Sequence, residues 1–126
     1  MTRVLVVDDD QVSCDILAEL CELWGHEVAI AMDGQKALTV CAEFEPDVVL
    51  LDLGLPGLDD WAVARRIRAE AGDRVHIIAL GEWRRPSDRS GALLAGADDY
   101  FVKPCDLDVL RNLLNVAPGR IATRTR

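Results

Sequence analysis

The sequence predicts an α/β fold built on one open, doubly wound sheet of five parallel strands. Strand-like and helix-like patterns alternate five times along the 126 residues, and such alternation indicates right-handed crossovers between parallel strands. Three of the strand patterns are almost continuously apolar, as expected for strands that helices cover on both faces. No internal repeat is present. We therefore predict a single domain over residues 1–117.

The predicted strands are short apolar runs bounded by polar or turn-forming residues. The first, third and fourth have the least interrupted apolar character. The five strands are expected at Arg3–Val7, His26–Ala31, Asp47–Leu51, Val75–Leu80 and Tyr100–Val102.

Each predicted strand is followed by apolar residues at helical spacing. The first helix shows the pattern most clearly, and Asp33 is suited to cap the second. The helices are expected at Gln11–Trp24, from Asp33 past Cys41, from about Asp59 to Ala71, near Ser87–Ala95 and at Asp106–Asn115.

The last nine residues, 118–126, differ in character from the rest of the chain. They contain three arginines and no acidic residue. Because Pro118 and Gly119 interrupt a helical pattern, we predict that this stretch is a flexible basic tail or the start of a linker.

The overall composition excludes several classes of function. A net charge of -8 argues against nucleic-acid binding by this domain, because phosphate backbones attract Lys and Arg. No apolar run approaches the roughly 20 residues of a membrane helix, and the start of the chain lacks a signal-peptide pattern. We expect a cytoplasmic protein with no membrane contact.

The four cysteines form no C-x-x-C pair and have no metal-ligand spacing. Two of them lie seven residues apart, on one face of the first predicted helix. The residues are Cys14, Cys21, Cys41 and Cys105. We interpret them as reduced thiols that pack in the interior.

Charged residues cluster where the predicted strands end. Asp8, Asp9 and Asp10 follow the first strand, Asp52 follows the third, and Lys103 follows the fifth. The carboxyl ends of parallel strands form the usual ligand-binding edge of such a sheet. Carboxylates crowded there repel one another unless a cation joins them, and Mg²⁺ prefers such oxygen ligands.

A simpler interpretation is that the three consecutive acids cap the following helix, because acidic side chains favour the positive end of its dipole. This interpretation suits Asp10 well. It does not account for Asp52 or Lys103.

Three stretches resemble those of the receiver domains of two-component response regulators. They are VLVVDDD, VVLLDLGLPGLDDW and GADDYFVKP, and they occur in the same order over residues 3–116. The resemblance implies a flavodoxin-like fold with strand order 2-1-3-4-5. It also implies a phosphoacceptor module that receives its phosphoryl group from a histidine kinase or a histidine phosphotransfer protein.

The resemblance assigns the central roles to the acidic residues. Asp52 is the implied phosphoacceptor. Asp8 and Asp9 are the implied Mg²⁺-positioning pair, and Asp52 and the backbone carbonyl of Gly54 complete the metal site, with Mn²⁺ as an alternative ion. Phosphoryl transfer depends mainly on positioning and charge neutralisation, which agrees with a carboxylate nucleophile beside a metal and a cation.

The end of the fifth strand carries the remaining implied roles. Lys103 matches the lysine that contacts the phosphoryl oxygens, and Pro104 matches the proline that follows a cis peptide bond. Tyr100 matches the aromatic switch residue, although plain packing is an alternative for it. The implied output is a change in binding to a downstream protein or to a fused output domain.

The sequence departs from the receiver pattern at the end of the fourth strand. Receiver domains normally have Thr or Ser there, and their hydroxyl contacts the phosphoryl group. Counting back from Lys103 places Gly81 at this position, followed by Glu82. A charge-assisted hydrogen bond worth about 1.5–3 kcal/mol is therefore missing, and we expect an atypical switch.

Other functions remain open at this point. A pseudo-receiver that docks partners without phosphorylation is favoured by Gly81 and Glu82. A phosphatase of the haloacid-dehalogenase type would need an aspartate at position 54, which is glycine. A flavin-binding protein would need a phosphate loop rich in Ser, Thr or Gly after the first strand. We expect a signalling domain and not a metabolic enzyme.

Overall fold

A computed structural model of the chain describes residues 2–52, 60–81, 86–103 and 106–124. Its strands are short, and each of the five is followed by an α-helix that begins within nine residues. The strands are β1 (Arg3–Val7), β2 (Glu27–Ala31), β3 (Val48–Asp52), β4 (His76–Gly81) and β5 (Asp99–Val102). The helices are α1 (Gln11–Leu23), α2 (Gly34–Phe44), α3 (Asp60–Ala71), the 3₁₀ turn Gly72–Arg74, α4 (Pro86–Leu94) and α5 (Leu107–Arg124).

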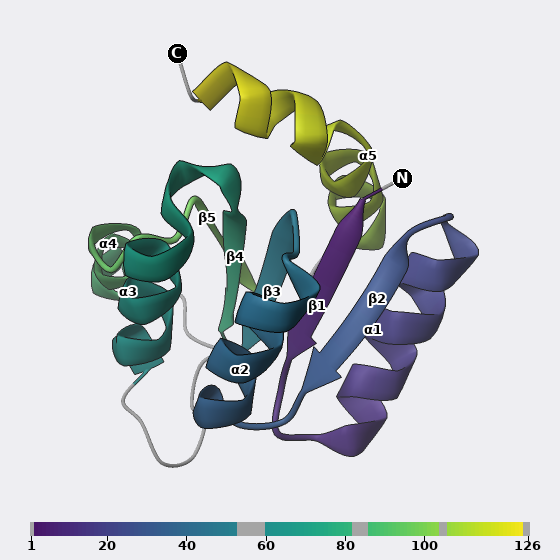
Figure 1. Ribbon diagram of the computed structural model, residues 1–126, viewed down its shortest axis with the longest axis horizontal. Coiled ribbons are helices and arrows are strands. Elements are labelled where there is room, and N and C mark those ends of the chain that lie inside the picture. Colours follow the sequence, from purple (N-terminus) through teal and green to yellow (C-terminus); the bar gives the residue numbers. More distant parts are fainter. Residues whose placement is uncertain (1, 53–59, 82–85, 104–105, 125–126) are drawn as a thin grey trace.

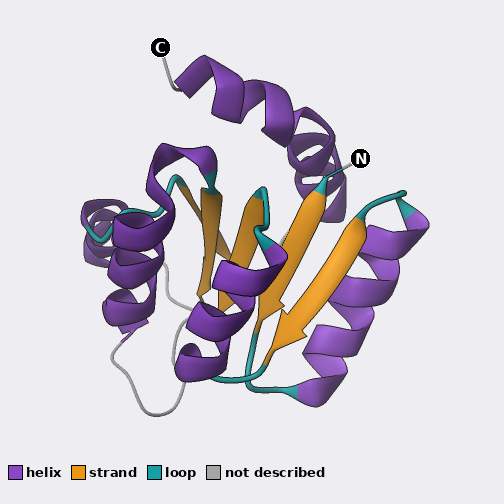
Figure 2. Ribbon diagram, in the orientation of Figure 1, coloured by secondary structure: helices purple, strands orange, loops and turns teal. Residues whose placement is uncertain are grey.

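The five strands form one parallel sheet in the order β2-β1-β3-β4-β5, as Figure 1 shows. This confirms the predicted fold class and strand order. The register places Val7 beside Leu51, Asp52 beside Leu80 and Gly81 beside Val102. All carboxyl ends of the strands therefore meet at the same edge of the sheet (Figure 2).

Helices cover both faces of the sheet, and each face has its own apolar core. One core is built from strand residues together with α2, α3 and α4, and includes Ala37, Val63, Ile67, Ala92 and Tyr100. The other uses the alternate strand positions together with α1 and α5, and includes Cys14, Cys21, Leu110 and Leu114. The three central strands, β1, β3 and β4, are buried on both sides, which explains why their sequences are almost continuously apolar.

The amino-terminal edge of β4 and β5 is joined by a compact charged network. The Arg68 guanidinium donates hydrogen bonds to the carbonyl oxygens of Gly72 (2.6 Å), Val75 (2.7 Å) and Gly96 (2.8 and 3.0 Å), and to the Asp98 carboxylate (2.7 Å). Asp98 also accepts from the backbone N–H of Ile77 (2.8 Å). The network fixes the end of α3 against the start of both strands.

His76, the first residue of β4, lies fully buried within the same network. Its Nε2 lies 2.8 Å from Asp99 Oδ2, and its Nδ1 lies 3.6 Å from Asp98 Oδ2. The contact with Asp99 gives the Nε2 atom of this buried imidazole the hydrogen-bond partner that buried polar groups require.

Most element boundaries differ from the predictions by one residue, but the end of the last helix was wrongly predicted. We expected it to stop at Asn115, and α5 continues through Pro118 and Gly119 to Arg124. A proline within a helix removes one backbone hydrogen bond, and here helical backbone continues beyond it. The last turns, yellow in Figure 1, project past the sheet.

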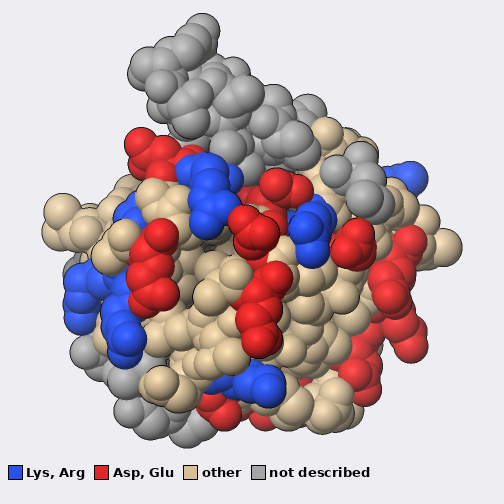
Figure 3. Space-filling model, viewed as in Figure 1, with Lys and Arg blue, Asp and Glu red and all other residues tan. Residues whose placement is uncertain are grey.

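The surface seen in Figure 3 carries Lys, Arg, Asp and Glu side chains interspersed over the residues that the structure describes. Among these residues no helix is long and apolar enough to span a membrane.

Candidate functional site

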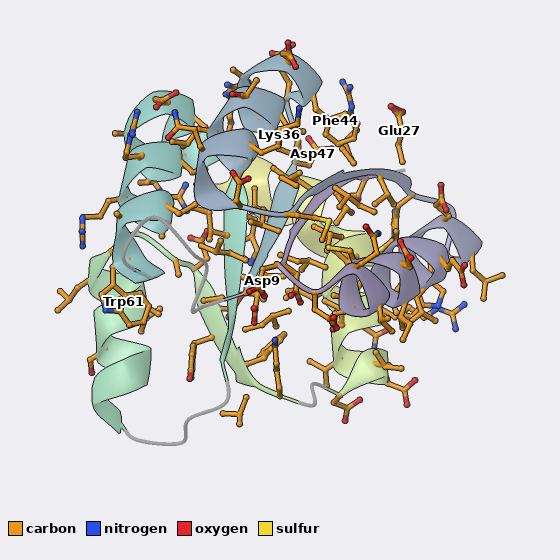
Figure 4. All side chains as sticks on the ribbon, turned by 90° about the horizontal axis from the view of Figure 1, so that it is seen from below. Asp9, Glu27, Lys36, Phe44, Asp47 and Trp61 are labelled. Carbon is orange, nitrogen blue, oxygen red and sulfur yellow. The ribbon has the colours of Figure 1, made fainter. Side chains whose placement is uncertain are left out.

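Three aspartates converge at the carboxyl edge of the sheet, as the strand order predicts. Asp8 and Asp9 follow β1, and Asp52 is the last residue of β3. One carboxylate oxygen from each lies within 4.8 Å of the other two. Figure 4 looks onto this edge, with Asp9 near its centre. The pairing of β1 with β3 is what brings residues 44 positions apart in sequence into one cluster.

Asp52 is buried at the end of a fully buried strand. Burial raises the pKa of its carboxyl group to about 6, and the neighbouring charges of Asp8 and Asp9 act in the same direction. A hydrogen bond and the positive charge of Lys103 oppose this rise. The site therefore holds a carboxylate whose charge is incompletely compensated by the protein.

Lys103 supplies the cation of the site. Its ammonium forms an ion pair with Asp52 Oδ1 and lies 3.9 Å from Asp8 Oδ2. Its backbone N–H donates to the carbonyl oxygen of Gly81 at 2.7 Å. This bond ties the chain after β5 to the end of β4, so that the position of the ammonium depends on both strands.

The three consecutive acids have three different environments. Asp8 is buried, and its Oδ1 accepts a hydrogen bond from the Asp10 backbone N–H at 2.9 Å. Asp9 is exposed. Asp10 caps α1 by accepting from the backbone N–H of Ser13 (3.1 Å) and from its hydroxyl (2.8 Å), and these bonds lower the pKa of Asp10. The helix-cap interpretation is thus confirmed for Asp10, while Asp8 and Asp9 lie with Asp52.

Cys14 also contacts the acidic cluster, and the sequence analysis did not predict this contact. The prediction of a buried reduced thiol is confirmed for Cys14 and Cys21, but the Cys14 Sγ also donates to the Asp8 carbonyl oxygen at 3.2 Å. Burial raises the pKa of this thiol to about 11, so it remains a protonated donor. The available signal was its place one turn inside the helix that follows the acids.

Tyr100 is buried in the core between the sheet and helices α3 and α4. Its ring lies directly against the backbone of Gly81, where a Cβ atom would be 2.5 Å from the Tyr100 hydroxyl oxygen. Trp61 occupies a similar position against Gly91, with its ring 3.0 Å from a Cβ placed there. The contact between Tyr100 and Gly81 joins two positions for which the sequence analysis gave separate roles.

Several predicted residues lie outside the residues that the structure describes. They are Gly54, Glu82, Pro104 and Cys105. Their expected roles remain predictions.

The chemistry of the cluster fits a hard divalent cation. Asp8, Asp9 and Asp52 offer carboxylate oxygens, the ligand type that Mg²⁺ prefers, and a small number of protein carboxylates is typical of its sites. Among the described residues, the cluster contains no cysteine or histidine ligand of the kind that softer metals favour.

Comparison with known proteins identifies a single family. The sequence profile of the response regulator receiver domain matches residues 4–115. The chain is 46% identical over 105 residues to the transcriptional regulatory protein PrrA of Mycobacterium tuberculosis, covering 81% of this chain and 43% of that protein. It is 41% identical over 108 residues to the response regulator MprA of Mycolicibacterium vanbaalenii, covering 86% of this chain and 46% of that protein.

Solved structures agree with these matches. The receiver domain of the Francisella response regulator 1452 has a TM-score of 0.87 and 28% sequence identity, covering 95% of this chain and 98% of that domain. The chain spans less than half the length of the curated relatives described above.

Proposed function

The chain belongs to the receiver domains of two-component response regulators, and on that premise we propose that it accepts a phosphoryl group on Asp52. The donor is the phosphohistidine of a histidine kinase or a histidine phosphotransfer protein. The observation that carries the proposal is the place of Asp52, buried at the end of β3 between the ammonium of Lys103 and the carboxylates of Asp8 and Asp9.

In the transfer step, an Asp52 carboxylate oxygen attacks phosphorus as the bond from phosphorus to the donor nitrogen breaks. The electron pair of that bond stays with the imidazole, and the product is an acyl phosphate. Lys103 is placed to pair with the phosphoryl oxygens, because it already pairs with the nucleophile. The rigid strand holds the nucleophile in position, which is the larger part of catalysis in phosphoryl transfer.

Asp8, Asp9 and Asp52 would hold Mg²⁺, with Mn²⁺ as an alternative. When bound, such an ion would supply positive charge to neutralise the phosphoryl oxygens. The raised pKa of Asp52, caused first by burial and then by the charges of Asp8 and Asp9, supports this assignment, because a bound cation would favour the charged carboxylate. Self-phosphorylation from small donors and slow self-dephosphorylation follow from the same groups.

The output is a change in the binding of a downstream partner. The matched relatives are named as a transcriptional regulator and a response regulator, and each is more than twice as long as the stretch matched here. We propose that the domain ends near residue 117 and that residues 118–126 lead towards an output domain or partner. A regulator of this kind acts in the cytoplasm.

The test is an intact-mass measurement after incubation with acetyl phosphate and Mg²⁺. We expect the mass of one phosphoryl group to be added to the wild type, and the adduct to be lost after hydroxylamine treatment, which cleaves acyl phosphates. Asp52→Asn should show no adduct. Asp15→Asn, which removes an exposed carboxylate on α1, is the matched control and should behave as the wild type does.

The alternative function is a pseudo-receiver that binds its partner without phosphorylation. It is favoured by Gly81, which lacks the hydroxyl of the receiver pattern. A wild-type protein that takes no phosphoryl group from acetyl phosphate or from a panel of phosphorylated histidine kinases would establish this alternative and exclude the phosphoacceptor role.

A further inference from the structure

The contact between Tyr100 and Gly81 is closer than any side chain at position 81 would permit. A Cβ atom built on Gly81 would lie 2.5 Å from Tyr100 Oη, 3.0 Å from Cε1 and 3.1 Å from Cζ. Distances under 3.0 Å are essentially never found for real Cβ atoms. The ring therefore fills the volume that the side chain of any other amino acid would need.

The sheet register explains how the ring reaches this place. Tyr100 pairs with Ala79 on the neighbouring strand, and side chains two apart on a strand share a face. The ring therefore passes over the small Ala79 and continues along the strand to Gly81. The wall on that face is apolar and lined by small residues, because Ala79, Ala92, Ala95 and Ala97 belong to the same core as Tyr100.

Backbone conformation does not account for the glycine. The described glycines with positive φ are Gly25, Gly72 and Gly96, and Gly81 is a regular strand residue at the end of β4. Any L-amino acid can adopt that backbone conformation. Space for the tyrosine ring is the constraint that the structure shows at this position.

The same glycine also connects the ring to the phosphoacceptor site. Its carbonyl oxygen accepts the backbone N–H of Lys103 at 2.7 Å, and it directly follows Leu80, the ladder partner of Asp52. Gly81 therefore contacts both the Tyr100 ring and the backbone of Lys103, the residue whose ammonium pairs with Asp52.

We propose that Gly81 keeps Tyr100 buried in this position whether or not Asp52 is phosphorylated, so that the tyrosine does not move during switching in this receiver. A Thr or Ser at position 81 must shift before an aromatic ring can occupy its space. With glycine nothing has to shift. The role of this packing in signalling rests on the proposed function. The steric relation between Gly81 and Tyr100 can be measured without any phosphorylation.

The chain contains one tyrosine, so protein made with ¹³C-labelled tyrosine gives ring NMR signals from Tyr100 alone. In the free wild type we expect nuclear Overhauser effects between the Tyr100 Hε protons and the Gly81 Hα protons. Adding Mg²⁺ and beryllofluoride, a phosphoryl mimic, should leave these effects and the ring shifts unchanged while shifting amides around Asp52.

Gly81→Ala should abolish the contact and move the ring signals towards those of tyrosine in an unstructured peptide. Gly81→Thr should do the same in the free protein, and beryllofluoride should then return the ring to its buried position. Gly91→Ala is the matched control. It adds the same methyl group against the Trp61 ring and should leave the Tyr100 signals in place.

Three results would overturn the proposal: no contact in the free wild type, movement of the wild-type ring on addition of beryllofluoride, or an unmoved ring in Gly81→Ala. If Gly81→Ala does not fold, Gly81→Ala/Tyr100→Ala decides the matter. Recovery of folding in the double variant supports the steric conflict, and failure shows that Gly81 is needed for another reason. If beryllofluoride shifts no amide in the wild type, the phosphoacceptor role fails, and the free-protein measurements still decide the steric one.

Discussion

The two ends of the sheet use buried charge in opposite ways. At the amino-terminal edge of β4 and β5, the Arg68 guanidinium meets three carbonyl groups and Asp98, and His76 lies beside Asp99. At the carboxyl edge, three carboxylates have oxygens within 4.8 Å of one another, and among the described residues the ammonium of Lys103 pairs with Asp52. In the first arrangement every nitrogen of the Arg68 guanidinium donates to a carbonyl or carboxylate oxygen. The second arrangement has an excess of negative charge among the described residues.

This difference distinguishes a part of the fold that favours stability from the candidate functional site. Buried charges stabilise a fold only when their partners and hydrogen bonds are complete, and the network around Arg68 meets that requirement. The cluster around Asp52 does not, and its pKa near 6 records the cost. Residues placed at such a cost are typical of sites that act on a ligand or substrate.

The largest change in the free energy of unfolding is expected at the amino-terminal edge, on removal of Arg68. Arg68→Ala leaves the Asp98 carboxylate and three carbonyl groups without this donor, and should lower the free energy of unfolding by about 3 kcal/mol. Urea denaturation monitored by circular dichroism measures it. Arg66→Ala, an exposed residue of the same helix, should change stability by less than about 0.5 kcal/mol. Equal losses in the two variants would show that the network adds nothing specific.

At the carboxyl edge, removing a charge is expected to raise the free energy of unfolding, not to lower it. The folded-state pKa of Asp52, about 6, is raised above the ordinary carboxyl value, so the folded protein binds this proton more tightly than the unfolded chain does. The stability from that proton is complete below the unfolded pKa and is lost as the pH rises through about 6. Asp52→Asn removes the charge and should raise the free energy of unfolding by about 2 kcal/mol at pH 7.5 without divalent ions.

The gain from Asp52→Asn should shrink steadily as the pH is lowered towards 4, where the wild-type carboxyl group is protonated in the folded state. Urea titrations at several pH values check both the size and the slope. Asp108→Asn, which neutralises an exposed acid in the first turn of α5, should give no such gain. A wild type more stable than Asp52→Asn at pH 7.5 would mean that the pair with Lys103 outweighs the repulsion.

A smaller gain should come from adding the cation itself. Mg²⁺ at ten times its dissociation constant should stabilise the wild type by about 1.4 kcal/mol, seen as a rise in melting temperature. NaCl at matched ionic strength controls for screening. Asp9→Asn should leave the ion-free stability nearly unchanged, because Asp9 is exposed, and should reduce the response to Mg²⁺. The same response in both proteins would remove Asp9 from the site.

The fold and the position of the site follow directly from the sequence in this protein. Continuous apolar runs such as Val48–Leu51 mark strands buried on both faces, and the acids that end them meet once the strand order is known. The sequence does not predict where α5 ends, because Pro118 indicates a helix end and the helix continues to Arg124. A local propensity is outweighed wherever the rest of the helix supports continuation.

Two relations at the site depend on the three-dimensional packing and have no local signal in the sequence. From the sequence, glycine at position 81 indicates only that the usual hydroxyl is missing. The structure shows that the Tyr100 ring occupies the space that a side chain there would need. The three consecutive acids read alike, although Asp8 is buried and Asp10 faces Ser13. Their different environments depend on where β1 ends and α1 begins.

The smallest predicted effect is a change in melting temperature on replacing Asp10, and it tests whether Asp10 differs in role from Asp8 and Asp9. Asp10 caps α1 through two hydrogen bonds to Ser13, and they lower the pKa of its carboxyl group. Because the folded-state pKa is lowered, the stability it provides is present above the unfolded value and is lost as the pH falls through the folded value. Asp10→Ala should therefore lower the melting temperature by a few degrees near neutral pH and by less in acid.

The rise in melting temperature on adding Mg²⁺ should be the same in Asp10→Ala as in the wild type, because a helix cap is present in both the ion-free and the ion-bound protein. Asp10→Ser, which keeps a capping side chain without the charge, should recover most of the lost stability. Asp9→Asn should show the reverse pattern, with stability retained and the ion response reduced. If Asp10→Ala instead loses its response to Mg²⁺, this residue belongs with Asp8 and Asp9 in the metal cluster, and the division of labour among the three acids is wrong.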